Sequence, residues 1–412
     1  MLTVEEALQL MMERSSPLPP ARRALSEAAG CVLAEDVVAD LDSPPFDKAL
    51  VDGYAVRSTD LLGGDRWLRL GEEITAGRTP TRPLGPREAA AIMTGAPLPP
   101  EADAVVMLER TRREGDRVLI EDPAVAPGRN RLRRGREMEA GDVVLRRGER
   151  LNPARLGLLA SVGRSEVVVI PRPRVAVVPT GDELVEPDRV PGPGQIRNSN
   201  AVMLRALAVE AGAEAEALPI TPDDPDRLAE ALRRGLEADV LVITGGVSAG
   251  NRDLVPATLE RLGVARAFHK IRLKPGKPLW FGVGPARGDA PGPLVFGLPG
   301  NPVSGLVGFL LFVRPALDAL AARPARAAEA ERAPLAIPYQ PARDRPTYHP
   351  ARWTERRLDA GSHQVDRRAL EPLDWAGSAD LRTVAQADGF AIVPEGDHAY
   401  EVGEIVGFLP LR

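Results

Sequence analysis

The spacing of hydrophobic and polar positions predicts different kinds of structure along the chain. Near the N-terminus, Thr3 and Glu6 precede an apolar-periodic run, a pattern typical of a helix that opens with a capping box. Residues 66–150 alternate turn signals with short strand-like segments such as Ala104–Leu108 and Arg117–Ile120, which predicts a mainly β module. A helix over Asn152–Gly163 and a strand over Glu166–Ile170 are expected to follow.

From residue 172 onward, apolar strands run into polar loops and then into helices. The strands lie in RVAVVPTGDEL, ADVLVITGGVSAGNRD and PLVFGLPGNPVSGLVGFLLFV. The stretch SNAVMLRALAVEAGA, with Ser199 or Asn200 as its cap, and the segment Asp226–Leu236 are predicted helices. Strands that alternate with helices indicate βαβ units, and therefore a doubly wound, mostly parallel sheet over 172–318.

The end of the chain reads as a small β domain. Residues 321–334 are rich in Ala, Arg and Pro and mark a boundary, and β-like segments follow at Leu335–Tyr339, Phe390–Val393 and Glu404–Leu409. The predicted fold class is multidomain α/β. Its expected domains are an elongated mixed one (1–44 with 147–171), an inserted mainly β one (45–146), the α/β domain (172–318) and a C-terminal β domain (335–412).

Composition narrows the functional classes. The chain has 412 residues, a net charge of −5 and 27% charged residues, and no apolar run reads as long enough to span a bilayer. The acidic balance argues against a nucleic-acid binder, and the acidic, amphipathic N-terminus is unlike a signal peptide. A single cysteine, Cys31, and four histidines argue against disulfides and a Cys/His metal site. We expect a soluble, cytoplasmic protein without a membrane or nucleic-acid partner.

Three glycine-rich loops follow predicted strands of the α/β region. They are Pro179–Glu183 with its extension Gly194–Asn200, Thr244–Gly250 leading to Asp253, and Gly297–Gly305. In open parallel sheets the ligand binds beyond the carboxyl ends of the strands, where glycines let backbone N–H groups approach an anion. One such loop would be weak evidence, but three together predict a phosphate-bearing ligand. Neither a Walker A pattern nor G-x-G-x-x-G is present.

Lysine is rare and clustered. Only four of the 53 basic residues are lysines, and Lys270, Lys274 and Lys277 fall within eight positions. An extended Lys270–Leu273 would place Lys270, Arg272 and Lys274 on one face, and the Pro-Gly turn would return Lys277 toward Lys274. Because lysine and arginine are not interchangeable at a tight anion site, this cluster suits a small polyanion. A solvent-facing strand is the alternative.

Carboxylates also gather at the loops. They are Asp182, Glu183, Asp223, Asp224 and Asp253. Near a phosphate they suit Mg²⁺, which prefers oxygen ligands, but each of the last three is equally suited to cap a helix. Two further segments, Pro44–Arg57 and Ile92–Val106, have a more distinctive sequence than an ordinary loop requires. By local physics alone, Asp52-Gly53 is a turn and Thr94-Gly95 is the end of a helix.

Seven of these motifs, taken in order, resemble one family. They are DGYAV (52–56), IMTGAP (92–97), PTGDEL (179–184), GQIRNSN (194–200), TGGVSAGNRD (244–253), KPGKP (274–278) and GLPGNPVS (297–304). The chain resembles the molybdopterin molybdenumtransferases of molybdenum cofactor synthesis, the bacterial MoeA proteins and the related domain of gephyrin. The resemblance implies insertion of molybdate into adenylylated molybdopterin with Mg²⁺-dependent hydrolysis of the adenylate, which releases AMP and molybdenum cofactor.

The resemblance also implies roles for particular residues. It assigns catalysis to Asp52, Thr94, Glu183, Asp253, Lys274 and Lys277, and Mg²⁺ binding to Asp223 or Asp224, Asp253 and Glu183. It assigns substrate binding to Thr180, Gly181, Asp182, Asn198, Asn200, Gly245, Gly246, Ser248, Gly250, Pro299, Gly300, Asn301, Pro302 and Ser304. The Ser304 hydroxyl and the backbone after Pro302 would complete an oxyanion pocket around the two lysines.

Further implications concern partners and departures from the family pattern. Because Asp52 and Thr94 belong to another domain, the resemblance implies a homodimer that completes each site across subunits, and a transient contact with the molybdopterin adenylyltransferase.

The chain departs from the family pattern at two positions. Lys48 stands just before DGYAV without a clear role, and Glu137 occupies a position where aspartate is usual. Arg345 and Arg352 lie near where the family places an oxyanion-contacting arginine.

Three alternatives remain open. A non-catalytic molybdopterin-binding scaffold would keep the fold without needing the acidic and lysine residues. An adenylyltransferase would resemble the central domain alone and would not need the additional domains. A tungstate-inserting paralogue would share every motif, because molybdate and tungstate have similar size and charge.

Overall fold

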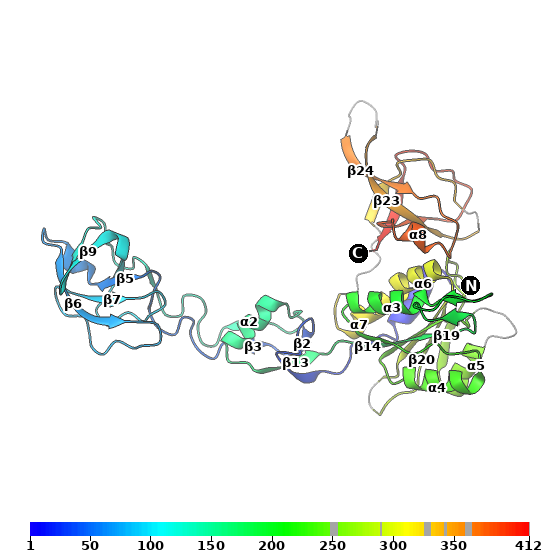
Figure 1. The fold of residues 1–412 in the computed structure, drawn as a ribbon, viewed down its shortest axis with the longest axis horizontal. Coiled ribbons are helices and arrows are strands. Elements are labelled where there is room, and N and C mark those ends of the chain that lie inside the picture. Colours follow the sequence, from blue (N-terminus) through cyan, green and yellow to red (C-terminus); the bar gives the residue numbers. More distant parts are fainter. Residues whose placement is uncertain (248–253, 289–290, 325–330, 342–343, 359–364, 412) are drawn as a thin grey trace. The chain divides into compact units, whose positions relative to one another are not determined.

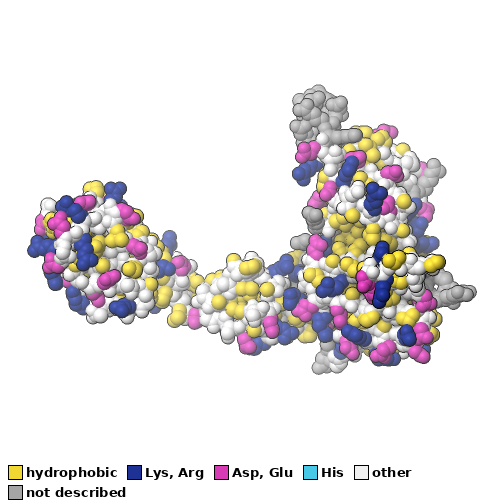
Figure 2. Space-filling model, in the orientation of Figure 1, with side chains coloured by type: hydrophobic (Ala, Val, Ile, Leu, Met, Phe, Trp, Pro, Cys, Tyr) yellow, Lys and Arg dark blue, Asp and Glu magenta, His cyan; other side chains and the backbone are white. Residues whose placement is uncertain are grey.

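The computed structural model describes residues 1–247, 254–288, 291–324, 331–341, 344–358 and 365–411 (Figure 1). The chain forms two compact units. Unit 1 comprises Met1–Arg23, Gly30–Ala34 and Val168–Arg412, and unit 2 comprises Ala24–Ala29 and Glu35–Val167. On the faces in view, acidic and basic side chains are interspersed on both units (Figure 2).

The centre of unit 1 is a six-stranded sheet. Its strands are β14 (Arg174–Pro179), β17 (Glu214–Ala217), β18 (Val240–Thr244), β19 (Ala265–His269), β20 (Trp280–Val283) and β21 (Leu294–Leu298), in the order β17-β14-β18-β21-β20-β19. The first four in this order are parallel, and the β21–β20 and β20–β19 pairs are antiparallel. The predicted α/β fold class with a mostly parallel sheet is confirmed.

Helices cover both faces of this sheet (Figure 1). One face packs against α1 (Val4–Met12), α3 (Ser199–Glu210), α6 (Pro302–Gly308) and α7 (Arg314–Leu320), and the other against α4 (Pro225–Gly235) and α5 (Leu254–Arg261). Successive side chains of a strand point to opposite faces, so Val240 and Val242 enter the first core while Leu241 and Ile243 enter the second. The sheet is therefore a doubly wound, fully buried layer.

One segment departs from the expectation that no apolar run could span a bilayer. Among the described residues, the continuous helical segment Pro302–Leu320 is long and apolar enough to span a bilayer, but most of it is buried inside the structure. It runs from α6 through a π-helical segment, Phe309–Val313, into α7. Its apolar side chains are part of the first core, which accounts for its composition.

The C-terminal part of unit 1 is an antiparallel sheet with one short helix. Its elements are β22 (Glu331–Pro334), β23 (Thr347–Leu358), β24 (Val365–Pro372), α8 (Leu381–Val384), β25 (Gly389–Val393) and β26 (Ile405–Pro410), with strand order β22-β26-β25-β23-β24. The first strand occupies the end of the segment read as a boundary. Residues 335–339, expected to be a strand, make only isolated bridges at Leu335 and Tyr339.

Unit 2 contains a second six-stranded sheet. Its strands are β5 (Gly53–Val56), β6 (Trp67–Ile74), β7 (Glu88–Ile92), β8 (Ala104–Met107), β9 (Thr111–Glu114) and β10 (Arg117–Ile120), in the order β8-β5-β7-β6-β10-β9. All neighbours are antiparallel except β6 and β7. Tyr54 and Val56 face one apolar cluster and Ala55 the other, as period-two alternation requires.

The remaining elements are short. They are β1 (Ala21–Ala24), β2 (Val32–Leu33) and β13 (Glu166–Ile170) in one sheet, the pairs β3 (Val37–Val38) with β12 (Val143–Leu145), β4 (Lys48–Ala49) with β11 (Arg131–Leu132) and β15 (Leu184–Val185) with β16 (Ile196–Arg197), the helix α2 (Pro153–Ser161), and the 3-10 turns Ser58–Leu61 and Leu108–Arg110.

Capping residues set the helix starts. The capping box of Thr3 and Glu6 is present at α1, as predicted. The N-cap of α3 is Asn198, whose side chain accepts from the backbone N–H of Ala201, so the expectation of Ser199 or Asn200 as the cap was wrong. That shift leaves the Asn200 side chain available for contacts between loops.

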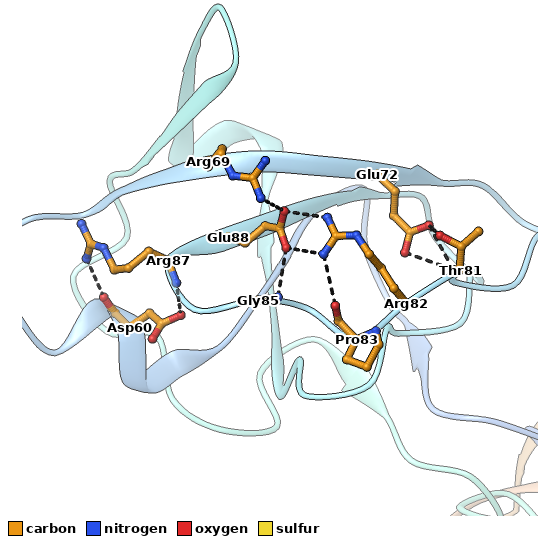
Figure 3. Close-up of polar contacts among 9 residues, drawn as sticks. All are labelled: Asp60, Arg69, Glu72, Thr81, Arg82, Pro83, Gly85, Arg87 and Glu88. Carbon is orange, nitrogen blue, oxygen red and sulfur yellow. Dashed lines mark hydrogen bonds and ion pairs between the residues drawn. The ribbon is translucent and has the colours of Figure 1, made fainter.

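A buried carboxylate ties β6 to β7 in unit 2 (Figure 3). Glu88 is 1% exposed, and it pairs with Arg69 at 2.8 Å and with Arg82 at 2.7 Å. The backbone N–H of Gly85 donates to it at 3.0 Å. These hydrogen bonds and positive charges, above all those of Arg82, lower the pKa of Glu88 to about 2, against the opposing effect of burial.

The same close-up shows how the turn before β7 is fixed (Figure 3). Arg87 has a positive φ of 57°, which is rare for residues other than glycine. Its backbone N–H donates to the Asp60 carboxylate at 2.8 Å, and its guanidinium donates to the Asp60 carbonyl at 3.0 Å. Nearby, Glu72 accepts from Thr81. The turn that delivers Glu88 to the interior is thus held by side-chain contacts on both sides.

We predict that Glu88→Gln destabilises the protein by about 2–3 kcal/mol, because it removes a buried charge that two arginines neutralise. Both arginines are partly exposed and stay hydrated, which limits the loss. The folded pKa of about 2 lies below the ordinary value of 4.5, so this stabilisation is complete above pH 4.5 and is lost as the pH falls toward 2.

Urea unfolding at pH 7 and at lower pH values measures both effects. Glu73→Gln on the neighbouring strand β6 is the control, since Glu73 is exposed and a surface change should cost less than about 0.5 kcal/mol. Equal stability of the wild type and Glu88→Gln at pH 7 would contradict the assigned role.

Candidate functional site

A cavity of about 590 Å³ opens at the carboxyl ends of three parallel strands in unit 1. Thr180 follows β14, Thr244 to Val247 end and follow β18, and Pro299 to Pro302 follow β21. The rest of the lining comes from Glu183, Leu184, Ile196 and Arg197, the start of α3, Pro278, and Ala379 and Leu381 of the C-terminal domain. The glycine-rich loops therefore share one cavity.

Strand register brings these loops together. Pro179 pairs with Thr244, and Thr244 pairs with Leu298, so β14, β18 and β21 end at the same level. Gly245 has a φ of +93°, and a Cβ there would lie 2.4 Å from the carbonyl oxygen of Thr180. Only glycine allows the two loops to approach so closely.

Asn200 links the three loops from within the cavity wall. Its amide nitrogen donates to the Thr244 hydroxyl at 2.7 Å and to the Gly300 carbonyl at 2.7 Å. Its side-chain oxygen is buried and has no hydrogen-bond partner. Since Asn198 caps α3, both asparagines of the RNSN motif hold the framework at the place where the N-terminus of this helix meets the cavity.

The predicted substrate-binding residues fall into three groups. Those that line the cavity are Thr180, Asn198, Asn200, Gly245, Gly246, Pro299, Gly300, Asn301 and Pro302. Those outside the lining are Gly181, Asp182 and Ser304. Ser304 is buried in α6, and its carbonyl oxygen lies against Gly276 of the lysine turn. Ser248 and Gly250, like the predicted catalytic and Mg²⁺-binding residue Asp253, lie outside the described residues.

Acidic residues gather beside one end of the cavity. Glu183 lines it, and the Asp182 carboxylate accepts from the backbone N–H of Asp223 at 3.1 Å. Although Asp223 as a residue is exposed, partial burial of its carboxyl group and the charges of Asp182 and Glu183 raise its pKa. Asp224 instead accepts from two backbone N–H groups as the N-cap of α4.

These acidic residues fit Mg²⁺ only as a site shared with substrate. In the part of the chain that the structure describes, no group of three or more His, Cys, Asp and Glu side chains is placed to hold a metal. Mg²⁺, however, is commonly bound by one or two carboxylates, several waters and substrate phosphates. Burial is the main cause of the raised pKa of Asp223, and the charges of Asp182 and Glu183 add to it, so a cation bound beside these carboxylates would favour the ionised form.

The lysine segment is not the strand that alternation suggested. Strand β19 ends at His269, and Lys270 has a positive φ of 68°. Ile271 and Leu273 are buried, and Lys274 is half-buried. Lys277 is exposed and directly precedes the cavity residue Pro278. The segment takes its shape from bridges to distant parts of the chain, Ile271 with Leu2 and Lys274 with Thr347.

The C-terminal domain supplies contacts that sequence reasoning missed. The Lys274 N–H donates to the Pro346 carbonyl at 3.0 Å, and the Tyr348 N–H donates to the Lys274 carbonyl at 2.8 Å. Ser378 accepts from the Asn301 amide at 2.9 Å through its hydroxyl. The GSAD segment around Ser378 carries no local signal of this role, because only the tertiary fold brings it to Asn301.

The two candidate arginines occupy different surroundings. Arg345 is half-buried, pairs with Asp344 at 2.8 Å and directly precedes the segment that bridges Lys274. The charge of Lys274 also helps to lower the pKa of Asp344, after the larger effect of the hydrogen bond from Arg345. Arg352 is exposed on β23 and pairs with Glu371 at 3.2 Å. Arg345 is thus the one beside the lysine segment.

In unit 2, Asp52 and Thr94 contact each other. The backbone N–H and the hydroxyl of Thr94 both donate to the Asp52 carboxylate at 2.7 Å, and these hydrogen bonds lower the pKa of Asp52. Thr94 lies in a turn after β7, so the expectation of a helix end there was wrong. The turn leaves the carboxylate fixed at the surface of unit 2.

Lys48 and Glu137 also form a pair. Glu137 accepts from the Ser43 hydroxyl at 2.7 Å and lies 3.6 Å from the Lys48 ammonium. The Ser43 hydrogen bond is the main reason that the pKa of Glu137 is lowered, and Lys48 adds to it. The structure therefore gives Lys48 a partner, which the sequence did not indicate.

Comparisons with known proteins agree over most of the chain. Three family models match, described as the MoeA N-terminal region (domain I and II) over residues 2–163, a probable molybdopterin binding domain over 176–319, and the MoeA C-terminal region (domain IV) over 332–411.

Individual relatives agree with the family models. A molybdopterin molybdenumtransferase of Staphylococcus aureus is 38% identical over 77% of this chain and 75% of its own length. Molybdopterin molybdenumtransferase 2 of Mycobacterium tuberculosis is 40% identical over 77% of this chain and 79% of its own length. Two solved structures of a molybdopterin biosynthesis MoeA protein from Pyrococcus horikoshii have TM-scores of 0.77 and 0.72, identities of 32% and 29%, and coverage of 100% and 99% of this chain and 99% of each neighbour.

We predict that Asp223→Asn raises the thermal unfolding temperature in metal-free buffer at pH 7, because it removes one charge from a group of like charges. Mg²⁺ should raise the unfolding temperature of the wild type more than that of the variant, since a ligand stabilises the state that binds it. Differential scanning fluorimetry with and without Mg²⁺ measures both. Asp188→Asn, a change at another exposed aspartate, is the control, and an unchanged Mg²⁺ response in Asp223→Asn would contradict the assignment.

Proposed function

The chain belongs to the molybdopterin molybdenumtransferase (MoeA) family of molybdenum cofactor biosynthesis, and on this premise we propose that it inserts molybdate into adenylylated molybdopterin with Mg²⁺-dependent hydrolysis of the adenylate. The products are AMP and molybdenum cofactor. The observation that carries this proposal is that the three glycine-rich loops and Glu183 line one cavity, which the lysine segment adjoins at Pro278.

The cavity suits a phosphate-bearing substrate. Its volume of about 590 Å³ lies within the usual range for small-molecule sites. Gly245, Gly246 and Gly300 present backbone there, and the N-terminus of α3 adds the positive end of a helix dipole. The molybdopterin phosphate and the pyrophosphate of the adenylate would bind against these groups.

Molybdate would bind at the lysine segment. Neither Lys274 nor Lys277 takes part in an ion pair with another described residue, so both charges are available to an incoming dianion. Arg345 and Ser378 lie on the C-terminal segments that contact Lys274 and Asn301, and we assign them to the same oxyanion site. Ser304 contributes through the backbone that packs on Gly276 rather than through its hydroxyl.

Glu183 and Asp223 would hold Mg²⁺, together with Asp253, which lies outside the described residues. The ion would supply positive charge where negative charge develops on the pyrophosphate as AMP leaves. The residues of the chain itself orient the adenylate, since the loops fix both phosphates relative to Glu183.

Asp52 and Thr94 would act in the site of a second subunit. The Asp52 carboxylate is ionised and fixed by Thr94, which suits a group that orients water or metal at a substrate. The proposal therefore includes a homodimer, a cytoplasmic location and a transient contact with the adenylyltransferase that supplies the substrate.

We expect AMP release from adenylylated molybdopterin only when Mg²⁺ and an oxyanion are both present. Chromatography of AMP, with molybdate, tungstate or neither, tests this and shows which oxyanion is accepted. Release without any oxyanion, or no release with substrate bound, would contradict the proposal and favour a binding protein.

A lysine variant tests where the oxyanion binds. Lys277→Gln should raise the KM for molybdate about tenfold, because it removes one charge from the dianion site. The KM for adenylylated molybdopterin should change little. Arg227→Gln on α4 removes an exposed positive charge on the other face of the sheet and serves as the matched control.

Subunit complementation tests the site across subunits. Asp52→Ala and the double variant Lys274→Ala/Lys277→Ala, which removes both charges of the dianion site, should each be inactive, but co-expressed chains should recover about a quarter of wild-type activity. Half of the dimers are then mixed, and each mixed dimer has one intact site. A mixture as inactive as its components would show that each site is completed within one chain.

A further inference from the structure

The C-terminal domain reaches the proposed oxyanion site through two separate segments. Thr347, at the start of β23, bridges Lys274 of the lysine segment. Ser378, in the loop between β24 and α8, contacts Asn301 through its hydroxyl and accepts from the Val303 N–H at 3.0 Å through its carbonyl. The two segments are some thirty residues apart in the chain, so their relative position depends on what joins them.

His349 joins them. It lies on β23 two residues after Thr347 and is 8% exposed. One ring nitrogen, Nε2, lies 2.7 Å from the carbonyl oxygen of Leu373, where the loop that carries Ser378 begins. The other, Nδ1, lies 2.9 Å from the Tyr339 hydroxyl.

The chemistry of these partners fixes the form of the ring. A carbonyl oxygen only accepts, so Nε2 carries the proton and donates to Leu373, and Nδ1 accepts from Tyr339. Burial lowers the pKa of His349, which agrees with a neutral ring. Trp375 of the same loop packs edge-on against the imidazole, with ring centroids 5.5 Å apart.

We propose that His349 is a positioning residue for the oxyanion site, holding the Ser378 loop in register with the Thr347 segment that bridges Lys274. The inference rests on the proposed function for the identity of the anion. His349 does not line the cavity, so its effect is indirect: it sets the place of Ser378 and of its neighbours Ala379 and Leu381, which line the cavity wall. Without this tether the lysine segment would stay in place, but the contacts of Ser378 with Asn301 and Val303 would be weakened.

Molybdate affinity, measured by isothermal titration calorimetry on the full chain, tests the role directly. We expect His349→Leu to weaken molybdate binding about tenfold or more, as is typical when a residue that orients a binding group is lost. His349→Gln, which retains a donor for the Leu373 carbonyl, should recover most of this loss. Tyr339→Phe removes only the second hydrogen bond and should weaken binding by a smaller factor that still exceeds about twofold.

The control is His398→Gln. His398 is an exposed histidine of the same domain that pairs with Glu404, and its substitution should leave molybdate affinity unchanged. Thermal unfolding of each variant shows whether it folds. If His349→Leu fails to fold, Tyr339→Phe decides the question.

The outcomes separate this inference from the proposed function. Molybdate affinity of folded His349→Leu or Tyr339→Phe within about twofold of wild type would overturn the positioning role, whether or not AMP is released. A wild type that binds molybdate but releases no AMP would overturn the proposed function and leave the positioning role to be judged on affinity. No molybdate binding by the wild type would overturn both.

Discussion

The register of three parallel strands is the constraint on which the site depends. Because β14, β18 and β21 are paired so that Pro179, Thr244 and Leu298 are level, the loops that follow them meet at one edge. Both faces of these strands are buried, and a slip of one residue would exchange the two apolar sets. The hydrophobic cores therefore fix the position of the polar loops as firmly as the hydrogen bonds do.

The site needs more than the α/β domain. The backbone of Lys274 pairs with the segment before β23, and the Asn301 side chain binds Ser378, so the C-terminal domain forms part of the wall around the lysine segment and the cavity. At the start of the lysine segment, Lys270 has a positive φ of 68°, and its backbone N–H donates to the Leu279 carbonyl at 2.9 Å. The site also has charges of both signs, because Glu183 lines the cavity and Lys277 directly precedes the cavity residue Pro278.

Two carboxylates of unit 2, one buried and one exposed, have different roles. Glu88 is a single buried carboxylate, and two arginines and one backbone N–H satisfy it. It joins two neighbouring strands and so contributes to the fold. Asp52 is a carboxylate fixed by Thr94 at the surface, where it is free to meet a ligand or another surface. Similar residue types thus serve the fold in one place and a candidate site in the other.

The sequence alone determined the fold class, the parallel sheet, the capping box of α1 and, through its ordered motifs, the family, because local periodicity and turn chemistry act over a few residues. It could not decide between Asp223 and Asp224, locate the cap of α3, or find Ser378 and His349. These features depend on which distant segments meet. Asp224 caps α4 because the helix begins at Pro225, and Ser378 can contribute to the site only because the fold brings it to Asn301. The lysine segment failed as a predicted strand for the same reason, since bridges to Leu2 and Thr347 outweigh its own alternation.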